Sequence, residues 1–249
     1  MDNFSNNDRE FVQYSNAGQT RAVAKDFVSN VLMLMSLGLM VSGALAYLTS
    51  VSEPLLNLMY NTDPEGYITG NSIFGWIVML APLAMVFGLR AGLRKFNAPT
   101  LTLLFLVFSA SMGLSLSSIF LIYSLSSISI TFFISAGMFG VMAIAGYTTK
   151  TDLTKMGSLL FMGLIGIIIA SLVNMFLGSS QLDYIISFIG VLVFTGLTAY
   201  DMQKVKQIGM SVEAGSEEAK KLAVTGALSL YLDFINLFLM LLRFFGNRD

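Results

Sequence analysis

The sequence predicts an all-α integral membrane protein with seven transmembrane helices, the seventh of them central in the bundle. The first observation is composition: 55% of the 249 residues are apolar and only 12% are charged, whereas a soluble domain has about a quarter charged residues. The second is a series of seven apolar runs, each close to the roughly 20 residues that a helix needs to cross a bilayer. The third is a one-sided distribution of basic residues between those runs. Together they indicate a single membrane domain over residues 27–246.

The seven apolar runs define the expected spans. Residues 1–26 are polar and mixed in charge, and we interpret them as an N-terminal tail. They do not look like a signal peptide, because the first apolar run is longer than the apolar region of a signal peptide. The expected spans are 27–49, 72–90, 101–123, 128–148, 156–177, 184–201 and 222–243.

Lysine and arginine gather on one side of these spans. Twelve of them fall in the N-terminal tail and in the connections after the second, fourth and sixth runs, and none falls in the other three connections. Basic residues concentrate in cytoplasmic loops, so the N-terminus is expected in the cytoplasm and the C-terminus outside. Arg243 and Arg248 lie at the predicted outer end. They leave open a last helix that re-enters the membrane and returns the tail to the cytoplasm.

Small residues recur every four positions in two of the runs. Ser109, Gly113 and Ser117 do so in the third run, and Ala136 and Gly140 do so in the fourth. Small side chains at this spacing let helices approach closely in lipid, so we expect both sets at helix–helix contacts.

The chain contains no cysteine and no histidine. Disulfides, thiol catalysis, zinc sites and pH sensing by imidazole are therefore excluded. We expect no enzyme activity, no cofactor and no nucleic-acid partner. The expected surroundings are the lipid bilayer, together with small ions and other membrane proteins.

Asp233 is an ionisable residue deep inside the last apolar run. A charged aspartate near the bilayer centre costs about 2.5–3.5 kcal/mol on insertion scales, so such residues face the bundle interior and have a partner. Ser229 and Asn236 lie four residues before and three residues after Asp233, on the same helix face. This polar stripe predicts that the last helix lines an internal space.

Two residues on the basic side are candidate partners for Asp233. Asp201 ends the sixth run, where it could instead pair locally with Lys204 or Lys206. Arg90 ends the second run, where it could extend to lipid headgroups or turn inward to a carboxylate. Two adjacent buried carboxylates share a proton, which makes a pH-sensitive element without histidine. If both ionise, their oxygens suit Ca²⁺, and we name Asp201 and Asp233 as its candidate ligands.

Two motifs resemble those of a known family. "FTGLTAYDMQKVK" at 194–206 and "LSLYLDFINLFLMLLRFFG" at 228–246 are similar to the paired signature of the Bax inhibitor-1 family, also called the transmembrane Bax inhibitor motif family. The resemblance covers about residues 20–246 and favours a bacterial-type member, because the chain lacks the basic C-terminal tail of the animal proteins. It implies a seven-helix fold whose last helix is enclosed by the other six.

The resemblance also implies a function. Bacterial members of this family are similar to pH-sensitive calcium leak channels, in which an aspartate pair matching Asp201 and Asp233 controls the pore. An arginine latch matches Arg90, with Arg94 as a possible substitute. Tyr200, Ser229 and Asn236 are the candidate pore-lining residues. The expected location is a bacterial inner membrane, with Ca²⁺ and protons as the interacting ions.

Other functions stay open at this point. A non-transporting regulator of stress or protease pathways and a cation/proton exchanger both fit the same residues. An intramembrane aspartyl protease also uses two helix-borne aspartates, but its second motif is glycine-rich, whereas "LYLDFIN" is bulky. A retinal-based pump needs a lysine in the last helix, and residues 222–242 contain none.

Overall fold

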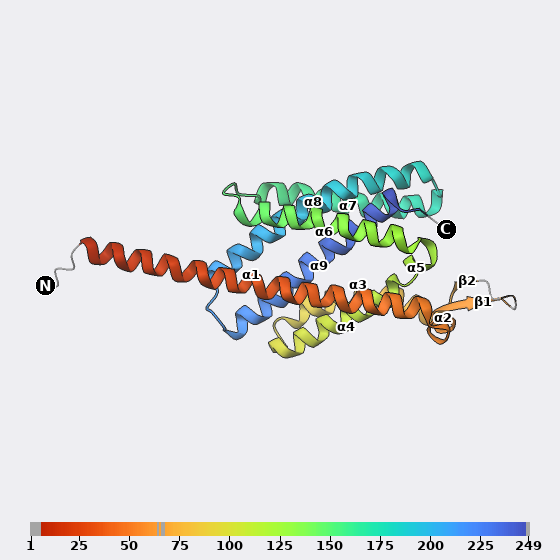
Figure 1. The fold of residues 1–249 in the computed structure, drawn as a ribbon, viewed down its shortest axis with the longest axis horizontal. Helices are drawn as coiled ribbons and strands as arrows, with labels where there is room; N and C mark the ends of the chain where they lie inside the picture. Colours follow the sequence, from red (N-terminus) through yellow and green to blue (C-terminus); the bar gives the residue numbers. More distant parts are fainter. Residues whose placement is uncertain (1–5, 64, 66–67, 248–249) are drawn as a thin grey trace.

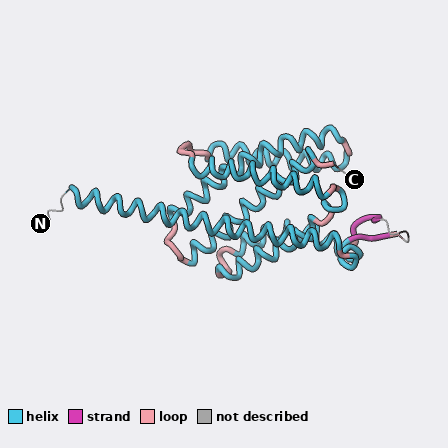
Figure 2. Tube along the Cα trace, in the orientation of Figure 1, coloured by secondary structure: helices cyan, strands magenta, loops and turns pink. Residues whose placement is uncertain are grey.

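The computed structural model describes residues 6–63, 65 and 68–247, with side chains from Arg21 onward (Figure 1). Most of the described residues are helical, with loops between the helices and one short hairpin, as the tube in Figure 2 shows. The elements, in order, are α1 (Asn6–Val51), α2 (Glu53–Met59), β1 (Tyr60–Thr62), β2 (Ile68–Asn71), α3 (Ile73–Gly92), α4 (Ala98–Leu116), α5 (Ile119–Ile122), α6 (Leu125–Thr148), α7 (Thr154–Leu177), α8 (Ser180–Ser211) and α9 (Glu217–Phe245).

Within the described residues, seven helical segments are long and apolar enough to cross a membrane, which confirms the predicted fold class. Two of them differ from the expected spans. Helix α1 begins at Asn6, so most of the expected tail is helical, and α8 continues past residue 201 to Ser211. Sequences such as "DMQKVKQ" are polar but consist of good helix formers, so a helix continues after its apolar signal has ended.

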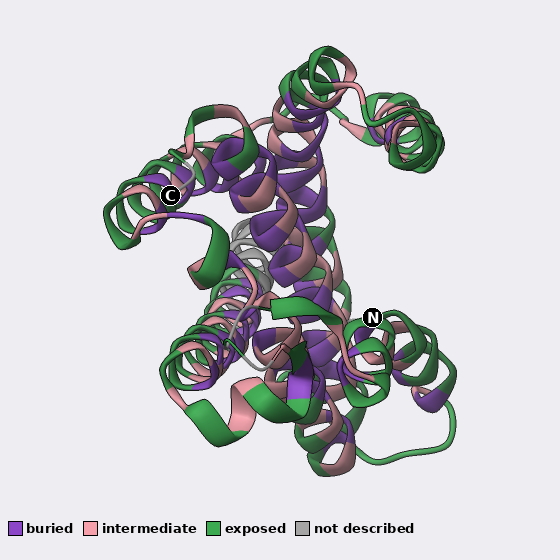
Figure 3. Ribbon diagram, turned by 90° about the vertical axis from the view of Figure 1, so that its right-hand side faces the viewer, coloured by how far each residue is buried: buried purple, intermediate pink, exposed green. Residues whose placement is uncertain are grey.

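Helix α9 lies at the centre of the bundle. In the 18-residue apolar stretch of α9, 72% of the residues are buried, whereas 6–44% are buried in the corresponding stretches of the other six spans. Its neighbours are α8, α1, α6 and α4, while α3 packs chiefly on α4 and α7 packs chiefly on α8. The outer helices present large side chains outward, such as Phe133, which is 74% exposed, and Phe176, which is 84% exposed. Figure 3 shows the resulting buried interior and exposed periphery, the pattern expected of a bundle surrounded by lipid.

The bundle has two chemically distinct ends. The connections α3–α4, α6–α7 and α8–α9 lie at one end, which we call the basic end because it includes Arg94, Lys95 and Lys150 (Figure 1). The β1–β2 hairpin, α5 and the C-terminal end of α9 lie at the opposite end. There, the Asn247 amide donates to Ser127 Oγ at 3.1 Å. Helix α9 therefore crosses the whole bundle, and the alternative of a re-entrant last helix is wrong.

Close helix contacts use one predicted small-residue set and not the other. A Cβ on Gly113 would stand 2.5 Å from the Ser42 carbonyl oxygen of α1, so the prediction for the third span is confirmed. The prediction for the fourth span is wrong, because Ala136 is exposed and a Cβ on Gly140 would meet nothing within 4 Å. Gly146 of α6 is the residue that packs against α8, directly on the Ala199 backbone.

Candidate functional site

Asp201 of α8 and Asp233 of α9 meet inside the bundle. Asp201 is 9% exposed and Asp233 is 6% exposed, and their side chains are joined by a hydrogen bond. Helices α8 and α9 are antiparallel neighbours joined by a short connection, residues 212–216. This hairpin brings together two acids that are 32 positions apart in the sequence.

A hydrogen bond between two carboxyl groups requires a proton, because an ionised carboxylate is only an acceptor. A direct bond between Asp201 and Asp233 is therefore one that only a protonated pair can make. One oxygen of Asp233, Oδ2, is buried and has no hydrogen-bond partner within the described part of the chain. Buried polar atoms are nearly always paired, so this oxygen is placed to share a proton with Asp201 or to accept from a water molecule or a cation.

Two cations act on this pair from nearby. Arg90 of α3 and Lys204 of α8 both interact electrostatically with Asp201. Among the described side chains, neither forms an ion pair with it within 4.0 Å, and both are exposed. Lys206 is engaged elsewhere, since its Nζ donates to the Tyr147 carbonyl at 2.6 Å. Arg90 is thus near the pair but not bound to it.

The three candidate pore-lining residues are placed differently. Ser229 and Asn236 are both half-buried on α9, and the Asn236 amide donates to its own helix at the Leu232 carbonyl, 2.8 Å away. The ring of Tyr200 packs on α7 instead, over Gly157 and 6.1 Å from the ring of Phe161. Tyr200 therefore faces α7 and not the α8–α9 contact.

The number of acidic ligands limits what the site could hold. Within the described residues, no group of three or more acidic, cysteine or histidine side chains is placed to bind a metal ion. Calcium takes six to eight oxygen ligands. Two aspartates alone do not complete such a shell, so carbonyl or water oxygens would have to supply the remaining ligands.

A second polar network lies on the other side of α9, and the sequence analysis did not identify it. The Tyr231 hydroxyl is 2.6 Å from Ser42 Oγ of α1, and Ser42 Oγ lies 2.7 Å from the Ser109 carbonyl of α4. Tyr231 is fully buried, with its ring edge-on to Phe105 and Phe108. A tyrosine in an apolar run resembles ordinary core, so no sequence signal separates it from its neighbours.

At the opposite end, Arg243 has a partner that accounts for its position. Its guanidinium lies 3.6 Å from the carboxylate of Asp183 on α8. The pair borders a cavity of about 640 Å³ that Asn174 and Tyr123 also line. This cavity lies between helix ends and is separated along α9 from the aspartate pair.

Comparisons with known proteins agree with the two motifs. Residues 24–249 match the family model described as inhibitor of apoptosis-promoting Bax1. The inner membrane protein YbhL of Escherichia coli K12 is 45% identical over 231 residues, which cover 92% of this chain and 95% of that protein. An uncharacterized protein of Borreliella burgdorferi is 46% identical over 91% of this chain and 94% of its own. An uncharacterized membrane protein of Streptococcus pyogenes serotype M1 is 36% identical over 90% and 93%. The chain therefore belongs to the Bax inhibitor-1 family of membrane proteins.

Proposed function

We propose that the protein is a pH-sensitive calcium leak channel of a bacterial inner membrane, with its basic end in the cytoplasm. The observation that supports the proposal is the buried pair Asp201–Asp233, whose carboxyl groups interact directly between the two most buried spans. The inner membrane location is supported by the E. coli relative, which is named as an inner membrane protein. The orientation is supported by the twelve basic residues on one side.

A proton shared by Asp201 and Asp233 would hydrogen-bond α8 to α9. When it leaves, two negative charges face each other in a medium of low dielectric constant, where their repulsion is strong. The charges then need a cation, which can be a permeating Ca²⁺ or the guanidinium of Arg90. Because Arg90 is near Asp201 without an ion pair, a small movement of α3 would change which cation neutralises the site.

Calcium entry into liposomes tests the proposal. Purified protein is reconstituted with an internal calcium dye, and uptake is followed between about pH 5 and pH 8, across the range in which a shared carboxyl proton can titrate. Wild-type uptake should change with pH, while Asp201→Asn and Asp233→Asn should each remove the pH dependence. Glu213→Gln, an exposed acid in the α8–α9 connection, is the matched control and should behave as wild type.

Further variants separate the alternatives. Arg90→Ala should shift the pH dependence of uptake and Arg94→Ala should not, because Arg90 is the one that interacts with Asp201. A cation/proton exchanger would acidify or alkalise the lumen in proportion to calcium uptake, whereas a leak would not. Uptake no greater than that of empty liposomes at every pH, from monodisperse protein, would refute the channel and favour a non-transporting membrane regulator.

A further inference from the structure

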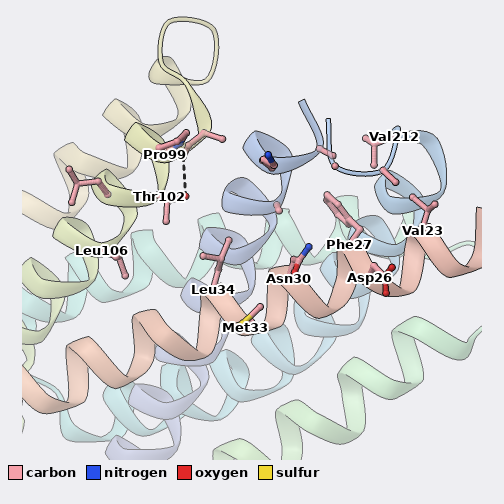
Figure 4. A pocket seen from close by; sticks show the side chains of 17 residues that line it. Val23, Asp26, Phe27, Asn30, Met33, Leu34, Pro99, Thr102, Leu106 and Val212 are labelled. Atoms are coloured by element: carbon pink, nitrogen blue, oxygen red, sulfur yellow. Dashed lines mark hydrogen bonds between the residues drawn. The ribbon is translucent and has the colours of Figure 1, made fainter. Parts of the chain in front are cut away.

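A large cavity opens at the basic end, away from the aspartate pair. It has a volume of about 770 Å³ and lies between α1, the start of α4, the start of α9 and the α8–α9 connection. In Figure 4, Pro99, Thr102 and Leu106 of α4 lie across from Leu34 and Phe27 of α1. This volume is within the range of about 300–1,000 Å³ that is usual for small-molecule sites.

The lining of this cavity changes from polar to apolar along the helices. Asp26 and Asn30 are one turn apart on α1, at the basic end, and Met33 and Leu34 follow them toward the bundle centre. On α4 the lining likewise extends inward, from the helix start to Leu106. The charged and amide groups of the lining therefore lie nearer the basic end, beside apolar residues such as Val23, while Leu34 and Leu106 lie nearer the bundle centre.

Two side chains of opposite charge line the cavity and do not form an ion pair with each other. Asp26 projects from α1 and Lys220 from α9, and both are exposed. Within the described residues, neither takes part in an ion pair within 4.0 Å. A ligand that fits this lining carries both an anionic group and a cationic group, joined to an apolar chain.

We propose that this cavity binds one phospholipid with an ethanolamine headgroup. Its phosphate would accept from Lys220, and its primary ammonium would donate to the Asp26 carboxylate and the Asn30 side-chain oxygen. One acyl chain would lie along Met33, Leu34 and Leu106. A choline headgroup has no N–H to donate, and a glycerol headgroup has no cation for Asp26, so both fit less well.

The N-termini of α4 and α9, which border the cavity, are joined by a hydrogen bond. The Glu217 carboxylate of α9 accepts from the Ala98 amide of α4 at 2.6 Å. Asn97 and Ser216 cap the same two helices through the amides of Thr100 and Ala219. These three amides already have partners, and Lys220 is the cationic side chain that lines the cavity, so the lipid phosphate is assigned to Lys220.

Native mass spectrometry of the full-length protein tests the proposal. The protein is equilibrated in detergent with equal amounts of ethanolamine, choline and glycerol phospholipids of identical acyl chains, and the retained lipids are counted. Wild type should retain one ethanolamine lipid, preferred over the choline lipid by about two- to fivefold, the effect of one partly exposed charge pair. Asp26→Asn should bring that ratio to about one, and Lys220→Gln should lower the retention of all three lipids.

Matched variants make the result specific to this cavity. Glu218→Gln and Lys221→Gln change like-charged residues at the same end that do not line the cavity, and both should behave as wild type. Thr102→Phe fills the cavity and should lower retention of every lipid, in protein whose melting temperature is unchanged. The proposal is overturned if wild type prefers the glycerol lipid, if it shows no preference, or if the control variants lose the preference as Asp26→Asn does.

Discussion

The contact between Tyr231 and Ser42 predicts a specific pattern in a double-mutant cycle. The geometry is that of a relay, in which the Tyr231 hydroxyl donates to Ser42 Oγ at 2.6 Å and Ser42 donates to the Ser109 carbonyl at 2.7 Å. Tyr231→Phe removes one hydrogen bond but keeps the ring contacts with Phe105 and Phe108. Its cost should be about 0.5–1.5 kcal/mol in free energy of unfolding, toward the lower value if it resembles other hydrogen bonds within membranes.

Ser42→Ala should be the more damaging change. It leaves the Tyr231 hydroxyl, in a side chain that is 0% exposed, without its acceptor. An orphaned buried polar group costs about 1–3 kcal/mol, more than a lost hydrogen bond. Adding Tyr231→Phe to Ser42→Ala removes the orphaned group, so the double variant should be no less stable than Ser42→Ala alone.

The cycle can be measured by titrating SDS into detergent micelles and following helical circular dichroism. Ser36→Ala and Tyr47→Phe, both at exposed positions of α1, are matched controls and should change the free energy of unfolding little. The reasoning is refuted if the two single effects add in the double variant, or if Tyr231→Phe costs more than Ser42→Ala. Either result would mean that the hydroxyl finds another acceptor and that the relay is not what stabilises the contact.

Two further predictions concern α6 and α7. Gly146→Ala should lower the melting temperature, at a cost of about 1–3 kcal/mol, because its Cβ would press on the Ala199 backbone, whereas Gly140→Ala should be neutral. Asp152 accepts from the Thr154 hydroxyl at 2.6 Å and from its amide at 2.9 Å, and these bonds hold the pKa of Asp152 below its usual value. At any pH above the ordinary aspartate pKa, the ionised Asp152 accepts both bonds and stabilises the start of α7. This stabilisation is lost as the pH falls through the lowered pKa of Asp152. Thr154→Ala should raise the pKa of Asp152, as followed by carboxyl NMR, and an unchanged pKa would contradict this.

Lipid imposes strong rules, so the spans and the need of Asp233 for a partner could be predicted from the sequence, whereas the choice of Asp201 as that partner came from the family resemblance. Apolar runs must be long enough to cross the bilayer, and a buried acid such as Asp233 must have a partner. The extension of α8 to Ser211 could not be seen in the same way, because outside the bilayer a polar helix has no hydropathy signal. The sequence also could not show which glycine of α6 packs against another helix. Gly140 and Gly146 are equally small, and only the structure shows that Gly146 lies on the side of α6 that meets α8.

The two polar contacts of α9 lie on different sides of the helix and have different consequences. Tyr231 fastens α9 to α1 and α4 through hydroxyls that do not change charge near neutral pH. Asp233 faces the carboxyl group of Asp201 on α8, and two carboxyl groups can bond to each other only when a proton is present. If the proposed function holds, a pH change should therefore shift α8 relative to α9, while α9 stays in place against α1.

Gly226 of α9 offers a direct test of this distinction, in a chain that has no native cysteine. A Cβ at Gly226 would lie 3.1 Å from a methyl group of Val205 on α8 and 3.3 Å from one of Val31 on α1, close enough for a disulfide to either helix. In the liposome assay, the oxidised pair Gly226→Cys with Val205→Cys should lose the pH dependence of calcium uptake and regain it on reduction. The oxidised pair Gly226→Cys with Val31→Cys should keep it throughout. If the α1–α9 disulfide removes the pH dependence and the α8–α9 disulfide does not, the moving contact is on the tyrosine side of α9, and the aspartate pair does not control the opening.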